Sequence, residues 1–212
     1  MSGIIGKKIG MTNIFQSDEA STKQIACTLL QVGPCVVTQV KTKETDGYDA
    51  IQLAYGEKKP KNTSKAMKVH FEKANTTPKF KVIEFKGFAK GKYQLGDVIT
   101  VSDIFSEKDV VNVIGTSKGK GFQGVVKRHG FSGVGATTHG QHDRARHPGS
   151  IGASSFPSRV FKGLRMAGRM GGDRIKTKNL KVLRIYAEDN AILVSGSVAG
   201  ANNSYITIEK IS

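Results

Sequence analysis

A glycine-rich stretch offers the first pattern with possible chemistry. Residues 119–124 satisfy Gly-x-Gly-x-x-Gly, the spacing that lets a backbone turn approach a pyrophosphate in dinucleotide-binding enzymes. That interpretation also needs an acid at the end of a second parallel strand. Asp143 stands at a suitable distance, but its neighbours 139–142 are not strand-like, and no strand–helix alternation surrounds them. We therefore interpret the stretch as flexible cationic backbone whose N–H groups lie against phosphates.

A second phosphate-binding pattern is incomplete. Residues 115–120, GTSKGK, resemble a nucleotide-binding loop but are one residue short, and neither Ser nor Thr follows the lysine.

Three histidines form a cluster that could hold a metal ion. His139, His142 and His147 lie within nine residues, but Arg144 and Arg146 stand between them and disfavour a cation. We expect no metal site here. Imidazoles beside arginines are suited to stacking on bases or to hydrogen bonding with ribose and phosphate.

No nucleophile–base pair stands out. Ser150, Ser154 and Ser155 follow His147, but proximity in sequence supplies no catalytic geometry. We expect these serines to be polar loop residues. We expect the protein not to be an enzyme, and to bind neither a small-molecule substrate nor a cofactor, apart from Mg²⁺ associated with RNA.

A cationic strip spans residues 161–172. Lys162, Arg165 and Arg169 recur every three or four residues, while four glycines disfavour an amphipathic helix. One interpretation is a solvated charged loop. The other, which we favour, is a strip that threads between RNA helices, with glycine permitting close approach and arginine contacting phosphates.

The charge of the chain is concentrated. The 212 residues contain 33 Lys and Arg against 17 Asp and Glu, a net charge of +16, with a pI near 9.9. Residues 115–176 hold 12 of these bases, two acids and 14 of the 25 glycines, hence a net charge of +10. A surplus this large predicts a polyanionic partner, either nucleic acid or an acidic membrane surface.

Other features favour nucleic acid in the cytoplasm. No run of 18 apolar residues exists, and the N-terminus becomes charged too soon for a signal peptide. Cys27 and Cys35 form no close pair, so we expect two reduced thiols in or near the core.

Outside the basic segment the pattern predicts short strands. The expected strands are 25–32, 36–40, 51–55, 80–85, 98–101, 110–114, 180–187, 192–194 and 205–208, and the expected helices are 64–74 and 122–129. We predict a mainly β chain: an antiparallel β-barrel of residues 1–114 and 177–212, interrupted by an extended basic insertion at 115–176. The insertion has too few apolar residues to fold alone, so we expect it to order only against a partner.

Six stretches identify a family resemblance. They are GKKIGMT at 6–12, GTSKGKGFQGVVKR at 115–128, THG at 138–140, PGSIG at 148–152, PSRVFKG at 157–163 and MAGRMG at 166–171. Together they resemble the bacterial form of the large-subunit ribosomal protein L3 family, from end to end of the chain.

The resemblance implies a structural role. It implies a barrel like those of translation factors, binding to large-subunit rRNA near its 3′ end early in assembly, and neighbouring large-subunit proteins. The loop tip, Gly149, Ser150, Ile151, Gly152 and Ala153, should approach the peptidyl transferase centre without joining its chemistry. Some relatives carry a methylated glutamine where this chain has Ala153, so that modification is absent here.

We expect the cations and histidines of the basic segment, with two N-terminal lysines, to bind rRNA. These residues are Lys7, Lys8, Lys118, Lys120, Lys127, Arg128, His129, His139, His142, Arg144, Arg146, His147, Arg159, Lys162, Arg165, Arg169 and Arg174. Two other hypotheses stay open at this point: a dinucleotide-dependent enzyme, and a nucleic-acid chaperone outside the ribosome.

Overall fold

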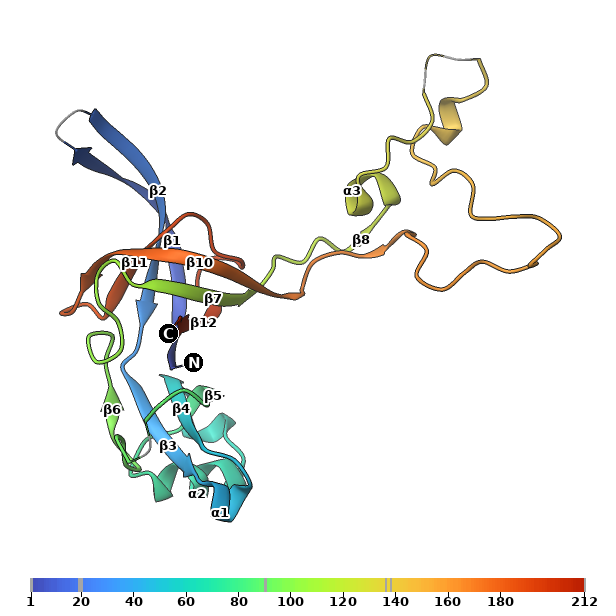
Figure 1. Ribbon diagram of the computed structural model, residues 1–212. Coiled ribbons are helices and arrows are strands. Elements are labelled where there is room, and N and C mark those ends of the chain that lie inside the picture. Colours follow the sequence, from blue (N-terminus) through green and yellow to red (C-terminus); the bar gives the residue numbers. More distant parts are fainter. Residues whose placement is uncertain (1, 19–20, 90, 136, 138, 212) are drawn as a thin grey trace. The chain divides into compact units, whose positions relative to one another are not determined.

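The computed structural model describes residues 2–18, 21–89, 91–135, 137 and 139–211. Thr138, part of the THG motif, lies outside them. The chain is mainly β, as predicted, and divides into two compact units, residues 1–117 with 174–212 and residues 118–173. Figure 1 shows the elements of each unit.

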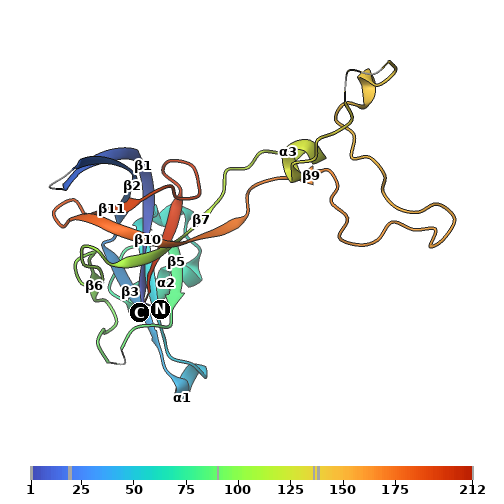
Figure 2. The same ribbon diagram turned by 45° about the horizontal axis from the view of Figure 1, so that its top comes forward.

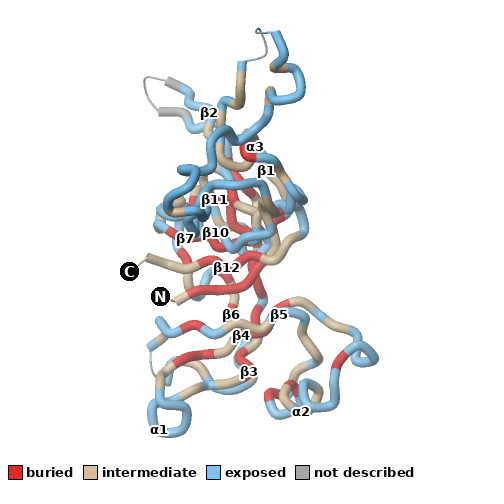
Figure 3. The backbone as a smooth tube through the Cα atoms, turned by 90° about the vertical axis from the view of Figure 1, so that its right-hand side faces the viewer, coloured by how far each residue is buried: buried red, intermediate tan, exposed pale blue. Residues whose placement is uncertain are grey.

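Six strands of the larger unit close into an antiparallel barrel in the order β1-β12-β7-β10-β11-β2. Their bounds are β1 Gly3–Asp18, β2 Ser21–Val32, β7 Val110–Thr116, β10 Arg174–Tyr186, β11 Ala191–Ser195 and β12 Tyr205–Lys210. Alternate side chains point inward, so Leu30, Ile192 and Ile208 are fully buried. Figure 3 shows this buried centre.

Four strands of the larger unit form a second sheet instead of joining the barrel. Its order is β5-β4-β3-β6, with bounds β3 Cys35–Lys41, β4 Ala50–Glu57, β5 Lys79–Phe85 and β6 Val98–Ile99. The prediction that residues 1–114 belong to one barrel is therefore wrong. Alternation identifies strands but not their partners, which are set by packing between residues far apart in sequence.

The two sheets share one core. Leu53 and Phe85 of the second sheet belong to the same buried cluster as Ile4 and Val113 of the barrel. Helices α1 Lys43–Asp46 and α2 Lys65–Lys73 and the short 3₁₀ turn η1 Pro60–Asn62 lie in the same part of the chain. The prediction of a helix near 64–74 is confirmed.

β1 was not predicted. Its pairing with β2 continues to Asp18↔Ser21, well past the residues that pair with β12, and Figures 1 and 2 show the resulting two-stranded arm. Glycines and lysines hide the strand pattern at the start of β1. A Cβ at Gly6 would collide with the carbonyl oxygen of Gln31, so close strand contact requires glycine there.

β10 begins within the segment predicted as insertion. Arg174, Ile175 and Lys176 pair with residues 116, 115 and 114 of β7. Their charge resembles that of the insertion, but backbone pairing places them in the barrel. β7 likewise continues to Thr116, so the smaller unit spans residues 118–173 and not the predicted 115–176.

The smaller unit contains little regular structure. It holds β8 Phe122–Gln123, helix α3 Val125–His129, the 3₁₀ turn η2 His142–Arg144 and β9 Gly168–Arg169. The helix predicted at 122–129 therefore begins three residues later. Phe122 and Gln123 are extended because they pair with Arg169 and Gly168.

Both cysteines are free thiols with fully buried side chains, as predicted. No helix of the described residues combines the length and apolar character needed to cross a membrane.

Candidate nucleic-acid interface

The smaller unit begins and ends in a paired stem. The amide of Lys120 donates to the carbonyl of Met170 at 2.9 Å, and the amide of Met170 donates to the carbonyl of Gly121 at 2.9 Å. Gly171, at φ +74°, lies so close to the carbonyl of Lys118 that a Cβ would collide with it. Glycine thus lets the outgoing and returning strands approach each other closely. The backbone hydrogen bonds between these strands hold Lys120 in place.

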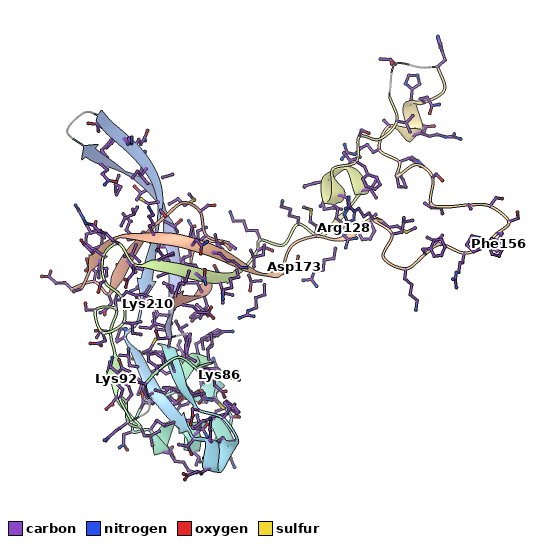
Figure 4. The ribbon with its side chains drawn as sticks, in the orientation of Figure 1. Lys86, Lys92, Arg128, Phe156, Asp173 and Lys210 are labelled. Carbon is purple, nitrogen blue, oxygen red and sulfur yellow. The ribbon has the colours of Figure 1, made fainter. Side chains whose placement is uncertain are left out.

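Helix α3 follows the outgoing strand and contacts the returning one. The Arg128 guanidinium donates through Nη1 to the carbonyl oxygen of Met166 at 2.7 Å. His129 Nε2 lies 3.1 Å from the same oxygen. Arg128 is labelled in Figure 4, beside α3. These contacts join the two strands of the stem beyond the β8–β9 ladder.

A second closure lies further along. The amide of Val134 donates to the carbonyl of Ala145 at 3.3 Å, and Gly133 packs so tightly on the same carbonyl that a Cβ would clash. The lobe between these points includes His139, His142 and Arg144, whose side chains are exposed. The histidines thus lie on a small closed loop.

The distal loop, defined here as residues 146–165, is almost wholly exposed. Phe156 has 88% of its surface accessible, Phe161 60% and Ile151 47%. Figure 4 shows Phe156 on this loop. The guanidinium of Arg159 lies over the Phe161 ring, 5.5 Å from its centroid. Exposed rings beside cations are suited to stacking on unpaired bases.

The expected tip residues 149–153 lie in the distal loop and are all exposed. The hydroxyl of Ser150 is 3.4 Å from both the amide and the carbonyl oxygen of Gly152, a weak local turn. Such a segment has little internal structure to define its shape.

Charge is handled differently in the two units. The larger unit pairs Lys41 with Glu84 at 2.8 Å and Lys210 with Asp109 at 2.6 Å. Hydrogen bonds from Lys41 and from Tyr48 hold the pKa of Glu84 below its ordinary value. The smaller unit has ten Lys and Arg but only two acids, Asp143 and Asp173, so its charge is far from neutralised.

This exposed cationic unit lies wholly within the sequence range that matches a known family. The family model for ribosomal protein L3 matches residues 51–197. The large ribosomal subunit protein uL3 of Salinibacter ruber (strain DSM 13855 / M31) is 57% identical over 209 residues, which cover 99% of each chain. The chain belongs to the ribosomal protein L3 family. It is a ribosomal protein, located with the ribosome in the cytoplasm.

Most of the predicted site residues of this ribosomal protein gather in the smaller unit. Fourteen of the seventeen rRNA-binding candidates, all but Lys7, Lys8 and Arg174, lie in residues 118–173. Twelve of these fourteen have exposed side chains, and Arg128 and His129 are half-buried. Arg174 is exposed at the start of β10 in the larger unit.

The structure argues against Lys8 as an RNA ligand. Its side chain is only 7% exposed, and its ammonium donates to the carbonyls of Val198 at 2.7 Å and Gly200 at 3.2 Å. A buried cation needs such hydrogen-bond partners, so the Lys8 ammonium stabilises the larger unit itself. Lys7 is half-buried, with its ammonium 5.1 Å from the centroid of the Tyr205 ring.

Three phenylalanines are additional candidates that the site prediction omitted. Phe122 is 76% exposed, and Phe156 and Phe161 are exposed on the distal loop. The available signal was their occurrence among glycines and arginines without the periodicity of a core strand or helix.

Among the described residues, no three His, Cys, Asp or Glu side chains converge as a metal site would require. His139 and His142 are exposed on the lobe.

Proposed function

We propose that the chain is a structural constituent of the large ribosomal subunit and binds its rRNA directly through residues 118–173. The observation that carries this proposal is the exposed backbone of the smaller unit, which bears ten cations against two acids. Val125 is the one apolar side chain among its described residues that is buried. A segment with so little core gains its order from a partner.

Affinity comes mainly from neutralised phosphates and the counterions they release. If about eight cations engage phosphates, log affinity falls against log salt with a slope of about −6 to −7. Specificity comes from the shape of the folded RNA, with Phe156, Phe161 and the histidines on unpaired bases. Mg²⁺ enters only as an ion associated with the rRNA.

The finer elements of the role follow from the family. We propose that the barrel is of the translation-factor type, that binding occurs early in subunit assembly near the 3′ end of the rRNA, and that other large-subunit proteins are neighbours. The tip at 149–153 then reaches toward the peptidyl transferase centre and has no catalytic role. With Ala153 at this position, no methylated glutamine contributes there.

A deletion tests the proposal. Removing residues 130–165 spares the strands of the larger unit and the β8–β9 stem, so circular dichroism should report a folded β protein. Its affinity for large-subunit rRNA, measured by filter binding, should fall sharply. If the folded deletion variant bound rRNA as tightly as the full chain, the proposal that residues 118–173 bind rRNA would be contradicted.

A further inference from the structure

One cation of the smaller unit is committed to a contact within the protein. Arg128 lies on α3, where its own amide donates to the carbonyl of Gly124 at 2.9 Å and fixes it in the helix. Its guanidinium then reaches 38 residues along the chain, to the Met166 carbonyl at 2.7 Å. Its neighbour Lys127 is exposed on the same helix.

Gly168 makes room for that guanidinium. A Cβ at position 168 would lie 2.5 Å from Nη1 and 3.1 Å from Cζ of Arg128. Gly168 has a φ outside the left-handed region, so alanine would not strain its backbone. Alanine at this position in β9, opposite Gln123, would therefore displace the Arg128 guanidinium, which crosses it.

The Met166 carbonyl thereby has two side-chain contacts from α3. His129 Nε2 lies 3.1 Å away and donates when that nitrogen carries a proton. Both contacts lie where the distal loop returns to the stem. They fix the returning strand at residue 166 relative to the outgoing strand at residue 129.

We propose that Arg128 is a positioning residue of the RNA-binding unit and not a phosphate ligand. It clamps the returning strand to α3 and so sets the spacing from which the distal loop departs. Because a preorganised binder loses less entropy on association, opening the clamp weakens binding without removing a phosphate contact. The inference rests on the proposed function and assigns this residue a different role within it.

Four variants of the full chain separate the two roles. Lys127→Ala removes a neighbouring exposed cation and leaves the clamp. Arg128→Ala removes both the charge and the clamp. Gly168→Ala keeps every charge and displaces the guanidinium. The fourth is the double variant Arg128→Ala with Gly168→Ala. Each is titrated with large-subunit rRNA across a series of salt concentrations, after circular dichroism shows an unchanged fold.

A clamp predicts a specific pattern. Gly168→Ala and Arg128→Ala each weaken binding about tenfold and leave the salt slope unchanged, whereas Lys127→Ala makes the slope shallower by about 0.7–0.9. In the Arg128→Ala background, Gly168→Ala has no further effect, because no guanidinium remains to displace.

Other patterns overturn the proposal. If Arg128 binds phosphate, Gly168→Ala is neutral and Arg128→Ala flattens the salt slope as Lys127→Ala does. If position 168 acts for another reason, the losses of the two single variants add in the double variant. Failure of the proposed function looks different, since the unmodified chain would then show no salt-dependent rRNA binding.

Discussion

The ammonium of Lys8 lies 2.7 Å from the carbonyl oxygen of Val198, a hydrogen bond that joins residues 190 positions apart. A second bond reaches Gly200 at 3.2 Å. The cation thus ties β1 to the segment before β12. Of the 33 Lys and Arg residues of the chain, this one stabilises the fold itself.

Substituting Lys8 tests that assignment. Lys8→Met keeps most of the side-chain volume but leaves buried carbonyls without their donor, so we expect a loss of about 1–3 kcal/mol in the free energy of unfolding. Urea unfolding measures it. Lys7→Met, which removes a half-buried ammonium over a ring, should cost less, about 0.5–1 kcal/mol. A larger loss for Lys7→Met would contradict the assignment.

The thiols give a second prediction. Burial raises the pKa of Cys35 to about 12 and raises that of Cys27 as well. Since the thiolate is the reactive species, Ellman's reagent at pH 8 should modify neither thiol in the folded protein and both after unfolding. Cys27 should react before Cys35 as denaturant rises, because it lies where β2 begins to leave the barrel for the two-stranded arm. Rapid labelling of Cys35 in native buffer would count against the buried core.

The pair Asp109–Lys210 predicts a loss of stability in acid. Burial alone raises the pKa of Asp109, but hydrogen bonds from Lys210 and from the amide of Ser106 outweigh it and hold the pKa below its ordinary value. A depressed carboxyl pKa contributes stability above the unfolded-state pKa, and that contribution disappears as the pH falls through the folded-state pKa.

Asp109→Asn should therefore destabilise the chain by about 0.2–1 kcal/mol at pH 7, the range for partly exposed pairs. The difference from the unmodified chain should shrink toward pH 3, as measured by urea unfolding at both pH values. Glu188→Gln, in the exposed turn after β10, is the matched control. If the loss of unfolding free energy in Asp109→Asn instead became larger toward pH 3, the assignment of a lowered pKa to Asp109 would be contradicted.

Phe156 predicts a contribution to RNA binding that does not depend on salt. Loss of a stacked base costs about 1–3 kcal/mol, so Phe156→Ala should weaken rRNA binding roughly 5- to 150-fold with the salt slope unchanged. Phe15→Ala is a suitable control, because Phe15 is 70% exposed in the other unit. Equal losses for the two variants would show that exposure alone, and not the distal loop, explains the effect.

Local patterns were enough to predict much of the fold. The apolar spacing after Ser64 predicts α2, and the alternation of apolar residues near Leu53 predicts β4. The sheet to which each strand belongs could not be predicted from the sequence, because strand pairing depends on contacts between residues far apart in the chain. β1 was missed for a related reason: its glycines and lysines show no strand pattern by themselves, and the close contact of Gly6 with Gln31 joins segments that are far apart in sequence.

The candidate site divides in the same way. Net charge and glycine content are properties of the sequence, so they locate the cationic unit without any knowledge of its fold. Lys8 and Arg128 could not be separated from the other cations, because their partners are the backbone carbonyls of Val198 and Met166, which have no sequence signature.

The central claim is that the exposed cations of the smaller unit bind rRNA by neutralising phosphates. The most direct measurement compares the salt dependence of rRNA affinity for the unmodified chain and for a variant with glutamine at positions 144, 146, 159, 162 and 165. If all five contact phosphates, the slope should become shallower by about 3.5–4.5 from its starting value of about −6 to −7. An unchanged slope in a folded variant would show that these cations do not face the RNA.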